Sequence, residues 1–84
     1  MKATTAPPGT VITLFVVYRD PSDYPGRFVV RRQHVVRGYL DPISDAVPWC
    51  VADTLAAARA QVPGWLTCLA RDPGDDPVIV ETWL

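Results

Sequence analysis

Residues 11–19 read Val-Ile-Thr-Leu-Phe-Val-Val-Tyr-Arg. This stretch is rich in β-branched and aromatic residues and is apolar on both alternating faces, which is typical of a strand covered on both sides. We therefore expect a central strand of a sheet. Residues 20–26 follow it and are dense in turn formers, with Pro25-Gly26 suited to the central positions of a type II turn. They predict the loop of a hairpin.

The second arm of this hairpin is expected in residues 27–37, Arg-Phe-Val-Val-Arg-Arg-Gln-His-Val-Val-Arg. Its composition is that of a strand, but two valines, four polar residues and two valines in succession break strict alternation. A β-bulge near Arg31 and Arg32, or an arm that projects past the sheet, would explain this order.

A single helix is expected downstream of a loop over residues 38–48 and a short extended segment over residues 49–52. Asp53 is a candidate N-cap for residues 54–62, which are rich in alanine. Within this helix Leu55, Ala58 and Val62 share one side, and Pro63-Gly64 supplies the stop.

Two further strands, over residues 65–71 and 78–84, flank a turn-rich segment and predict a second hairpin. The resulting order is β-β-α-β-β, which favours a two-layer α+β domain with a mainly antiparallel sheet of about four strands. One short helix covers one face of such a sheet, so the other face is expected to be partly solvated or to meet a partner. We expect residues 1–10 to be a flexible N-terminal tail and residues 11–84 to form one domain, since 84 residues suffice for one core.

Charge is distributed unevenly along the chain, although the net charge is −1. Residues 19–39 carry five arginines and two aspartates, whereas residues 40–84 carry two arginines and seven acidic residues. The two parts can pair in the fold or be displayed separately. The longest apolar run is far shorter than the roughly 20 residues of a membrane helix.

No secretory signal is recognisable, so we expect a cytoplasmic protein whose Cys50 and Cys68 are reduced thiols. Each cysteine is flanked by apolar residues, which indicates a small side chain packed in the core. His34 lies among polar residues and is interpreted as a solvated strand residue rather than a ligand or a base.

The motifs of common enzymes and cofactor sites are missing from the sequence. One histidine and two separate cysteines do not make the paired ligands of a zinc site, and single glycines in turns do not make a phosphate-binding loop. We therefore expect no cofactor, no metal and no enzymatic activity. A nucleophilic Cys68 activated by His34 is kept as a lesser alternative.

Arginines concentrated in residues 27–37 are the most unusual feature. Arg27, Arg31 and Arg37 share one side of an ideal strand with Gln33, and Arg32 lies among them. Arginine pairs with carboxylates through two hydrogen bonds at once, so these four residues predict a contact with an acidic protein surface. A nucleic-acid-binding β-ribbon is the alternative, and a solvated face neutralised by the chain's own aspartates is a further one.

The segments YRDPSDYPGRFVVRR and DPGDDPVIVETWL resemble short uncharacterised proteins from prophage regions of proteobacteria. This resemblance implies a phage accessory protein that acts by binding a host or phage protein, as anti-CRISPR inhibitors do. It implies no site residues. The sequence as a whole therefore predicts a small non-enzymatic protein-interaction module.

Overall fold

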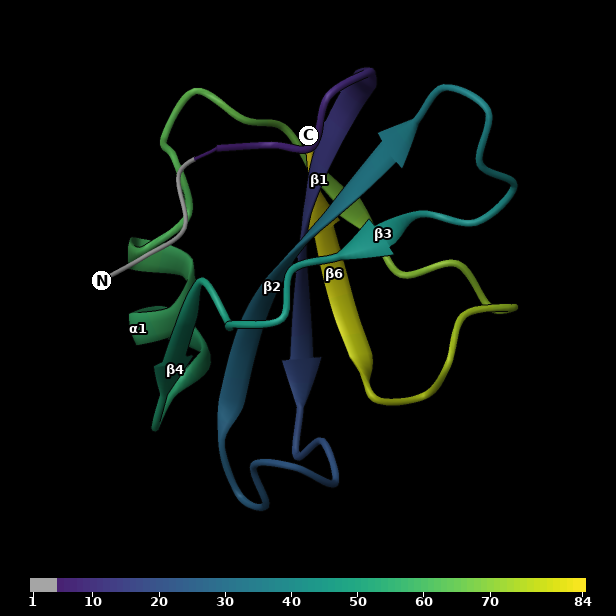
Figure 1. Cartoon of the computed structure of the whole chain (residues 1–84). Helices are drawn as coiled ribbons and strands as arrows, with labels where there is room; N and C mark the ends of the chain where they lie inside the picture. Colours follow the sequence, from purple (N-terminus) through teal and green to yellow (C-terminus); the bar gives the residue numbers. More distant parts are fainter. Residues whose placement is uncertain (1–4) are drawn as a thin grey trace.

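Strands β1 (Thr10–Arg19) and β2 (Phe28–Val36) form the hairpin around which the rest of the chain is arranged (Figure 1). They pair antiparallel along their whole length, with one irregularity between Thr10 and Ile12. The computed structural model describes residues 5–84. Residues 1–4 of the expected tail therefore lie outside the described residues, and Thr10 already belongs to β1.

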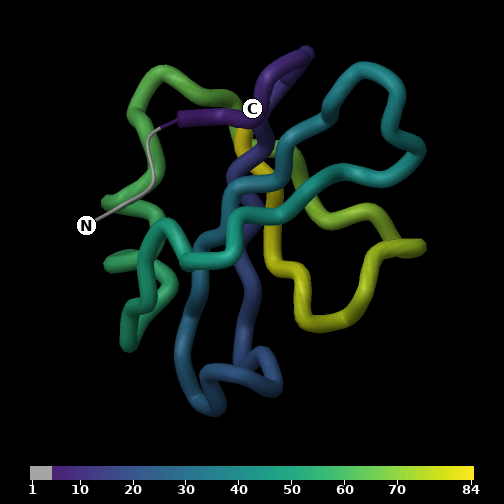
Figure 2. The backbone as a smooth tube through the Cα atoms, in the orientation of Figure 1, coloured from purple at the N-terminus to yellow at the C-terminus, as the bar shows by residue number. Residues whose placement is uncertain are grey.

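The loop between these strands contains the predicted type II turn. The Arg27 amide donates to the Tyr24 carbonyl over 3.2 Å, and Gly26 adopts φ +73°. The third residue of such a turn needs positive φ, which glycine adopts without steric cost. The Asp20 carboxylate accepts a hydrogen bond from the Gly26 amide at 2.5 Å and closes the loop from within. Figure 2 shows this loop projecting at one end of the molecule, opposite the C-terminus.

Within residues 5–84, six strands form one antiparallel sheet in the order β3-β2-β1-β6-β5, and β4 also pairs with β2. The shorter strands are β3 (Ile43–Ser44), β4 (Cys50–Ala52), β5 (Cys68–Ala70) and β6 (Ile79–Trp83). The predicted α+β class and the central position of the first strand are confirmed. The expected count of about four strands is roughly consistent with this sheet but less detailed. The additional strands, β3 and β4, have two and three residues, and β4 lies within the extended segment expected over residues 49–52.

No bulge occurs at Arg31 and Arg32, so that expectation was wrong. β2 is regular there, and its residues alternate between the two faces of the sheet. Arg32 and His34 occupy interior positions on one face, while Arg31 and Gln33 lie on the other. The valine-polar-valine order is therefore compatible with a regular strand, because the buried Arg32 and His34 share an acidic partner, Asp45, that is itself mostly buried.

Helix α1 (Leu55–Ala60) is shorter than predicted and is capped by Thr54 rather than Asp53. The Thr54 hydroxyl accepts a hydrogen bond from the Ala57 amide at 3.1 Å, whereas Asp53 forms an ion pair with Arg27. The predicted inward side is confirmed: Ala58 and Val62 are buried, and Leu55 packs against them in the core.

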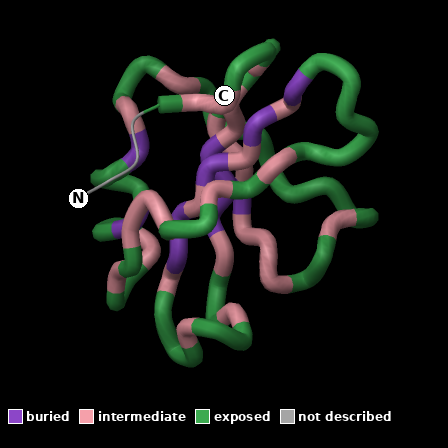
Figure 3. Tube along the Cα trace, in the orientation of Figure 1, coloured by how far each residue is buried: buried purple, intermediate pink, exposed green. Residues whose placement is uncertain are grey.

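The core lies between α1 and the sheet face that carries Phe15, Val17 and Val30 (Figure 3). Trp49 stands edge-on to Phe15, with ring centroids 5.1 Å apart and planes at 86°. Aromatic pairs favour this edge-to-face geometry because the positive ring edge meets the negative ring face. The two aromatic rings of this contact therefore come from segments that are distant in sequence.

The helix-free face is closed at its centre by its own long side chains. Tyr18 pairs with Val29, Gln33 pairs with Leu14, and the pair between them on this face is Val16 with Arg31. The Gln33 side-chain amide donates to the Tyr18 hydroxyl over 2.7 Å, so the tyrosine side chain must extend across that intervening pair. This explains why Val16 and Val29 are buried although no helix covers them.

Phe15→Ala is expected to destabilise the protein by about 3 kcal/mol or more, because it empties the core between the sheet and Trp49. Leu14→Ala, at the neighbouring half-buried position on the opposite face, is the matched control and should cost clearly less. Urea unfolding of both variants measures the difference. Equal losses would contradict this assignment of the two faces.

Candidate functional site

An open groove of about 510 Å³ lies between β4 and α1. The chain runs outward along β4, reverses at Asp53 and Thr54, and returns as the helix, so strand and helix form its two walls (Figure 1). The helix wall carries Thr54, Ala57 and Gln61, which lie on one side of the helix because they are three and four residues apart. The small side chain of Ala57 leaves the space open.

Trp49 lies at the far end of the groove, away from the turn between β4 and α1. Its indole N–H donates to the Gln61 carbonyl at the end of the helix over 2.7 Å, and its ring packs against Phe15 in the core. A hydrogen bond from the residue before β4 to the residue after α1 holds the two walls at a constant separation. The groove is therefore part of the folded structure and does not depend on a mobile loop.

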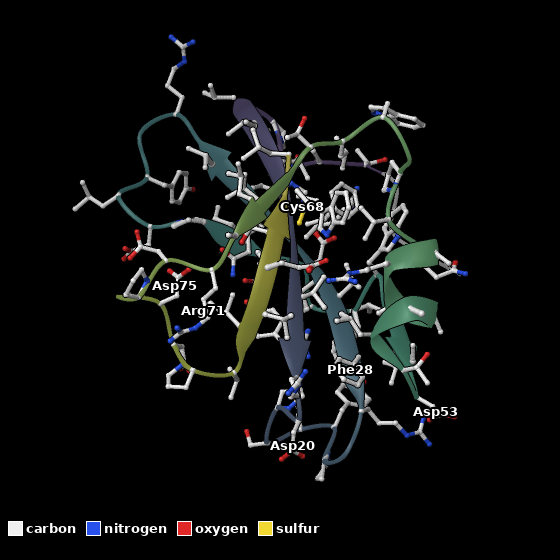
Figure 4. The ribbon with its side chains drawn as sticks, turned by 180° about the vertical axis from the view of Figure 1, so that it is seen from behind. Asp20, Phe28, Asp53, Cys68, Arg71 and Asp75 are labelled. Atoms are coloured by element: carbon white, nitrogen blue, oxygen red, sulfur yellow. The ribbon has the colours of Figure 1, made fainter. Side chains whose placement is uncertain are left out.

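The near end of the groove, beside the turn between β4 and α1, carries an ion pair. Arg27 Nε lies 3.1 Å from Asp53 Oδ1, and the two side chains are 52% and 81% exposed. Exposed pairs of this kind contribute little to stability, so either group is available for a ligand at low energetic cost. Figure 4 shows Asp53 at the start of α1, at the same end of the molecule as Phe28.

β4 lies at an edge of the sheet, beside the groove. One side of β4 pairs with β2, and no strand of residues 5–84 pairs with its other side. A free strand edge presents N–H and C=O groups that can pair with an added strand. The groove thus combines main-chain hydrogen-bonding groups, a small apolar floor and two opposite charges.

The four predicted arginines do not form one surface. Arg27 lines the groove, Arg31 pairs with Asp23, Arg32 pairs with Asp45, and Arg37 is exposed after the end of β2. The expectation of a surface position was wrong for Arg32, which is 5% exposed. The seven acidic residues of residues 40–84 indicated that the arginines could have partners within the chain. The sequence did not indicate which aspartate would pair with which arginine.

A buried polar network occupies the helix-side face next to the groove. Asp45 accepts hydrogen bonds from Arg32 Nε at 2.6 Å and from His34 Nε2 at 2.8 Å, and His34 Nδ1 lies 2.9 Å from the Thr13 hydroxyl. His34 is fully buried, so its interpretation as a solvated residue was wrong. Burial alone would raise the pKa of Asp45, but its hydrogen bonds with Arg32 and His34 hold that pKa below its usual value.

A buried carboxylate, Glu81, lies on β6. Arg59 of the helix donates to it twice, over 3.0 and 2.7 Å, and the Trp83 indole donates over 2.7 Å. The hydrogen bonds from Arg59 outweigh the effect of burial and lower the pKa of Glu81. This cluster ties the helix to the sheet, because its members come from α1 and from β6.

Cys50 and Cys68 are free thiols, but the expected interior packing was wrong for Cys68, which is exposed. Cys50 is half-buried. Local burial raises the pKa of the Cys68 thiol, and the nearby Glu81 carboxylate raises it further, which disfavours the reactive thiolate. The ring nitrogens of His34 contact Thr13 and Asp45, so the geometry does not bring Cys68 and His34 together as a catalytic pair.

Comparison with protein-family models, with curated proteins and with solved structures finds no match for this chain. Within residues 5–84, no helix has the length and apolar character needed to cross a membrane. No group of three or more histidine, cysteine or carboxylate side chains that could hold a metal ion occurs in that part of the chain.

Arg32→Gln is expected to destabilise the fold by about 3 kcal/mol, because it leaves the mostly buried Asp45 carboxylate, 14% exposed, without its arginine partner. Arg31→Gln at the neighbouring position should change the free energy of unfolding by less than about 1 kcal/mol, since its pair with Asp23 is more exposed. Chemical denaturation of both variants compares them directly. Equal effects would show that burial does not distinguish the two pairs.

The lowered pKa values of Asp45 and Glu81 predict acid unfolding. A carboxylate with a lower pKa in the folded state contributes stability above its unfolded pKa, roughly 4, and loses it as the pH falls through the folded value. Glu81→Gln should therefore unfold with a shallower pH dependence below about pH 4.5 than the wild type. Asp41→Asn, at an exposed position, controls for the loss of a surface charge. An unchanged slope in Glu81→Gln would exclude Glu81 as a source of the acid sensitivity.

Proposed function

We propose that this protein is a binding module that takes up an extended segment of another protein in the groove between β4 and α1. The observation that carries the proposal is the groove itself, which is lined by residues of the edge strand β4 and by one side of helix α1. Peptides commonly bind by adding a strand to such an edge, with main-chain hydrogen bonds supplying affinity and adjacent pockets supplying specificity.

The dimensions of the groove limit what it can hold. β4 has three residues, and strands rise about 3.3 Å per residue, so about three residues of a ligand fit against it. Cys50, Ala52 and Ala57 leave room for one larger apolar side chain between strand and helix. Arg27 and Asp53 at the near end favour a ligand with a charged or polar residue beside that apolar one.

The contacts of the arginines favour this site over an arginine-bearing surface. Arg31 and Arg32 already have aspartate partners, so a contact with an acidic protein would have to displace internal ion pairs. The same pairing weakens the nucleic-acid alternative, because phosphate binding needs several available cations along one surface. A cysteine nucleophile is disfavoured by the raised pKa of Cys68 and by the engagement of His34.

The resemblance to short prophage proteins suggests the origin of the partner. An accessory protein or inhibitor of that kind acts by occupying a segment of a host or phage protein. Such a role needs binding of a protein segment but no catalytic step. The groove offers apolar side chains and the charged pair Arg27–Asp53 for such binding. We therefore propose a host or phage protein with an exposed extended segment as the partner.

Ala57→Phe is expected to abolish binding, because the ring would fill the groove, while the amide of residue 57 can still donate to the Thr54 hydroxyl that caps the helix. Peptides selected from an unbiased displayed library on the wild-type protein provide the probes. Their affinity should fall at least tenfold on Ala57→Phe, which corresponds to about 1.4 kcal/mol. Ala56→Phe is the matched control, at an exposed helix position outside the groove lining. Equal affinity for wild type and Ala57→Phe would refute the site.

A further inference from the structure

β5 at the other end of the sheet is an unprotected edge. It is the last strand in the order, and all three of its residues are exposed. Exposed edges are usually blunted by charged residues or proline, yet Cys68, Leu69 and Ala70 include neither. Its shortness is therefore the main protection that it has against pairing with another strand.

The main-chain groups that point outward from β5 can be deduced from its pairing with β6. Thr67 and Leu84 exchange two hydrogen bonds, over 2.8 and 3.0 Å, so they form a hydrogen-bonded pair. Because such pairs alternate along an antiparallel ladder, Leu69 also bonds toward β6, whereas the N–H and C=O groups of Cys68 and Ala70 point to the free edge. The free edge thus offers two donors and two acceptors.

The edge borders an apolar part of the helix-free face. Leu69 pairs with Thr82 and through it with Val16, which places its side chain on that face, where it is 46% exposed. Leu84 and Ile12 are also more than one-third exposed near this side of the sheet. An apolar side chain next to a free strand edge favours a partner that is itself a strand with an apolar residue at the matching position.

We propose that a second copy of this chain pairs with β5, antiparallel about a two-fold axis at Leu69. In this register Leu69 lies opposite Leu69 of the second copy, and Cys68 lies opposite Ala70. The outward groups of Cys68 and Ala70 then form four main-chain hydrogen bonds, and the two leucines meet in a non-hydrogen-bonded pair, where side chains approach most closely. The interface is self-complementary, as a two-fold symmetric contact requires.

The distribution of charge selects the antiparallel arrangement. The β5–β6 connection carries Arg71 and three aspartates and lies away from α1, as Arg71 and Asp75 show in Figure 4. A parallel pair would set the two acidic loops side by side. The antiparallel pair instead places each loop beside residues 63–67 of the other copy, which contain no charged side chain. Like charges are thus kept apart.

This dimer is independent of the proposed peptide site, since β4 and β5 lie at opposite sides of the sheet. Pairing through β5 leaves both grooves open, so one dimer presents two of them. The two proposals are therefore tested by separate measurements, the peptide site by peptide affinity and the dimer by molecular mass.

Engineered disulfides test the register. Leu69→Cys is made with Cys50→Ser and Cys68→Ser, so that residue 69 carries the single thiol. Opposite residues of a non-hydrogen-bonded pair lie about 4.5 Å apart at Cα, within disulfide range, and mild oxidation should give a covalent dimer in high yield. Ala70→Cys in the same background is the control, because its two copies are out of register by two residues and exceed the roughly 7 Å limit. Equal yields, or no dimer from Leu69→Cys, would overturn the proposal.

Sedimentation velocity tests the association without a cross-link. The wild type should show a dimer whose fraction rises with concentration, and Leu69→Lys should be monomeric because two like charges would face each other at the axis. Val51→Lys places the same charge on the same face at the opposite side of the sheet and should leave the dimer intact. A wild type that stays monomeric up to millimolar concentration, or a dimer that survives Leu69→Lys, contradicts this interface.

Discussion

The carboxylate of Asp45 connects the buried side of β2 to the segment that leads into β4 and α1. It accepts hydrogen bonds from Arg32 and His34 of β2 and lies at the point where the chain leaves β3 and loops toward β4. The Asp45 amide also donates to the Arg32 carbonyl over 3.1 Å. A buried arginine without a carboxylate would be strongly destabilising, so β2 and residues 43–52 need each other.

This anchor determines where the groove forms. After Asp45 the chain detours through residues 46–48 and rejoins β2 at Trp49, whose amide donates to the Val30 carbonyl over 2.7 Å. Trp49 then receives the Arg32 guanidinium over its ring, with 5.4 Å between Cζ and the ring centroid, and contacts the end of α1. A continuous series of contacts thereby links the buried polar residues of β2 to Trp49 and to the end of α1. The proposed peptide site lies on the outer surface of these linked elements.

The sequence predicts the parts of this fold that depend on local chemistry. The apolar residues 11–19, the Pro25-Gly26 turn and the inward side of α1 were each predictable, because β propensity, turn conformation and helical spacing depend on neighbouring residues. His34 and Arg32 were misplaced, since their burial depends on Asp45, which is distant in sequence. The groove was missed for the same reason: small residues such as Ala57 become a binding surface when a strand edge lies opposite them, and no local pattern records that.

Hydrogen exchange of the main-chain amides in Asp45→Asn tests whether this carboxylate anchors β4. If the Asp45 carboxylate holds residues 43–52 against β2, the amides of Trp49, Cys50 and Ala52 should exchange much faster than in the wild type. The amides shared by β1 and β6, which do not depend on this anchor, should lose protection only to the extent that global stability falls. Unchanged protection in β4, or an equal loss of protection throughout the sheet, would contradict the account.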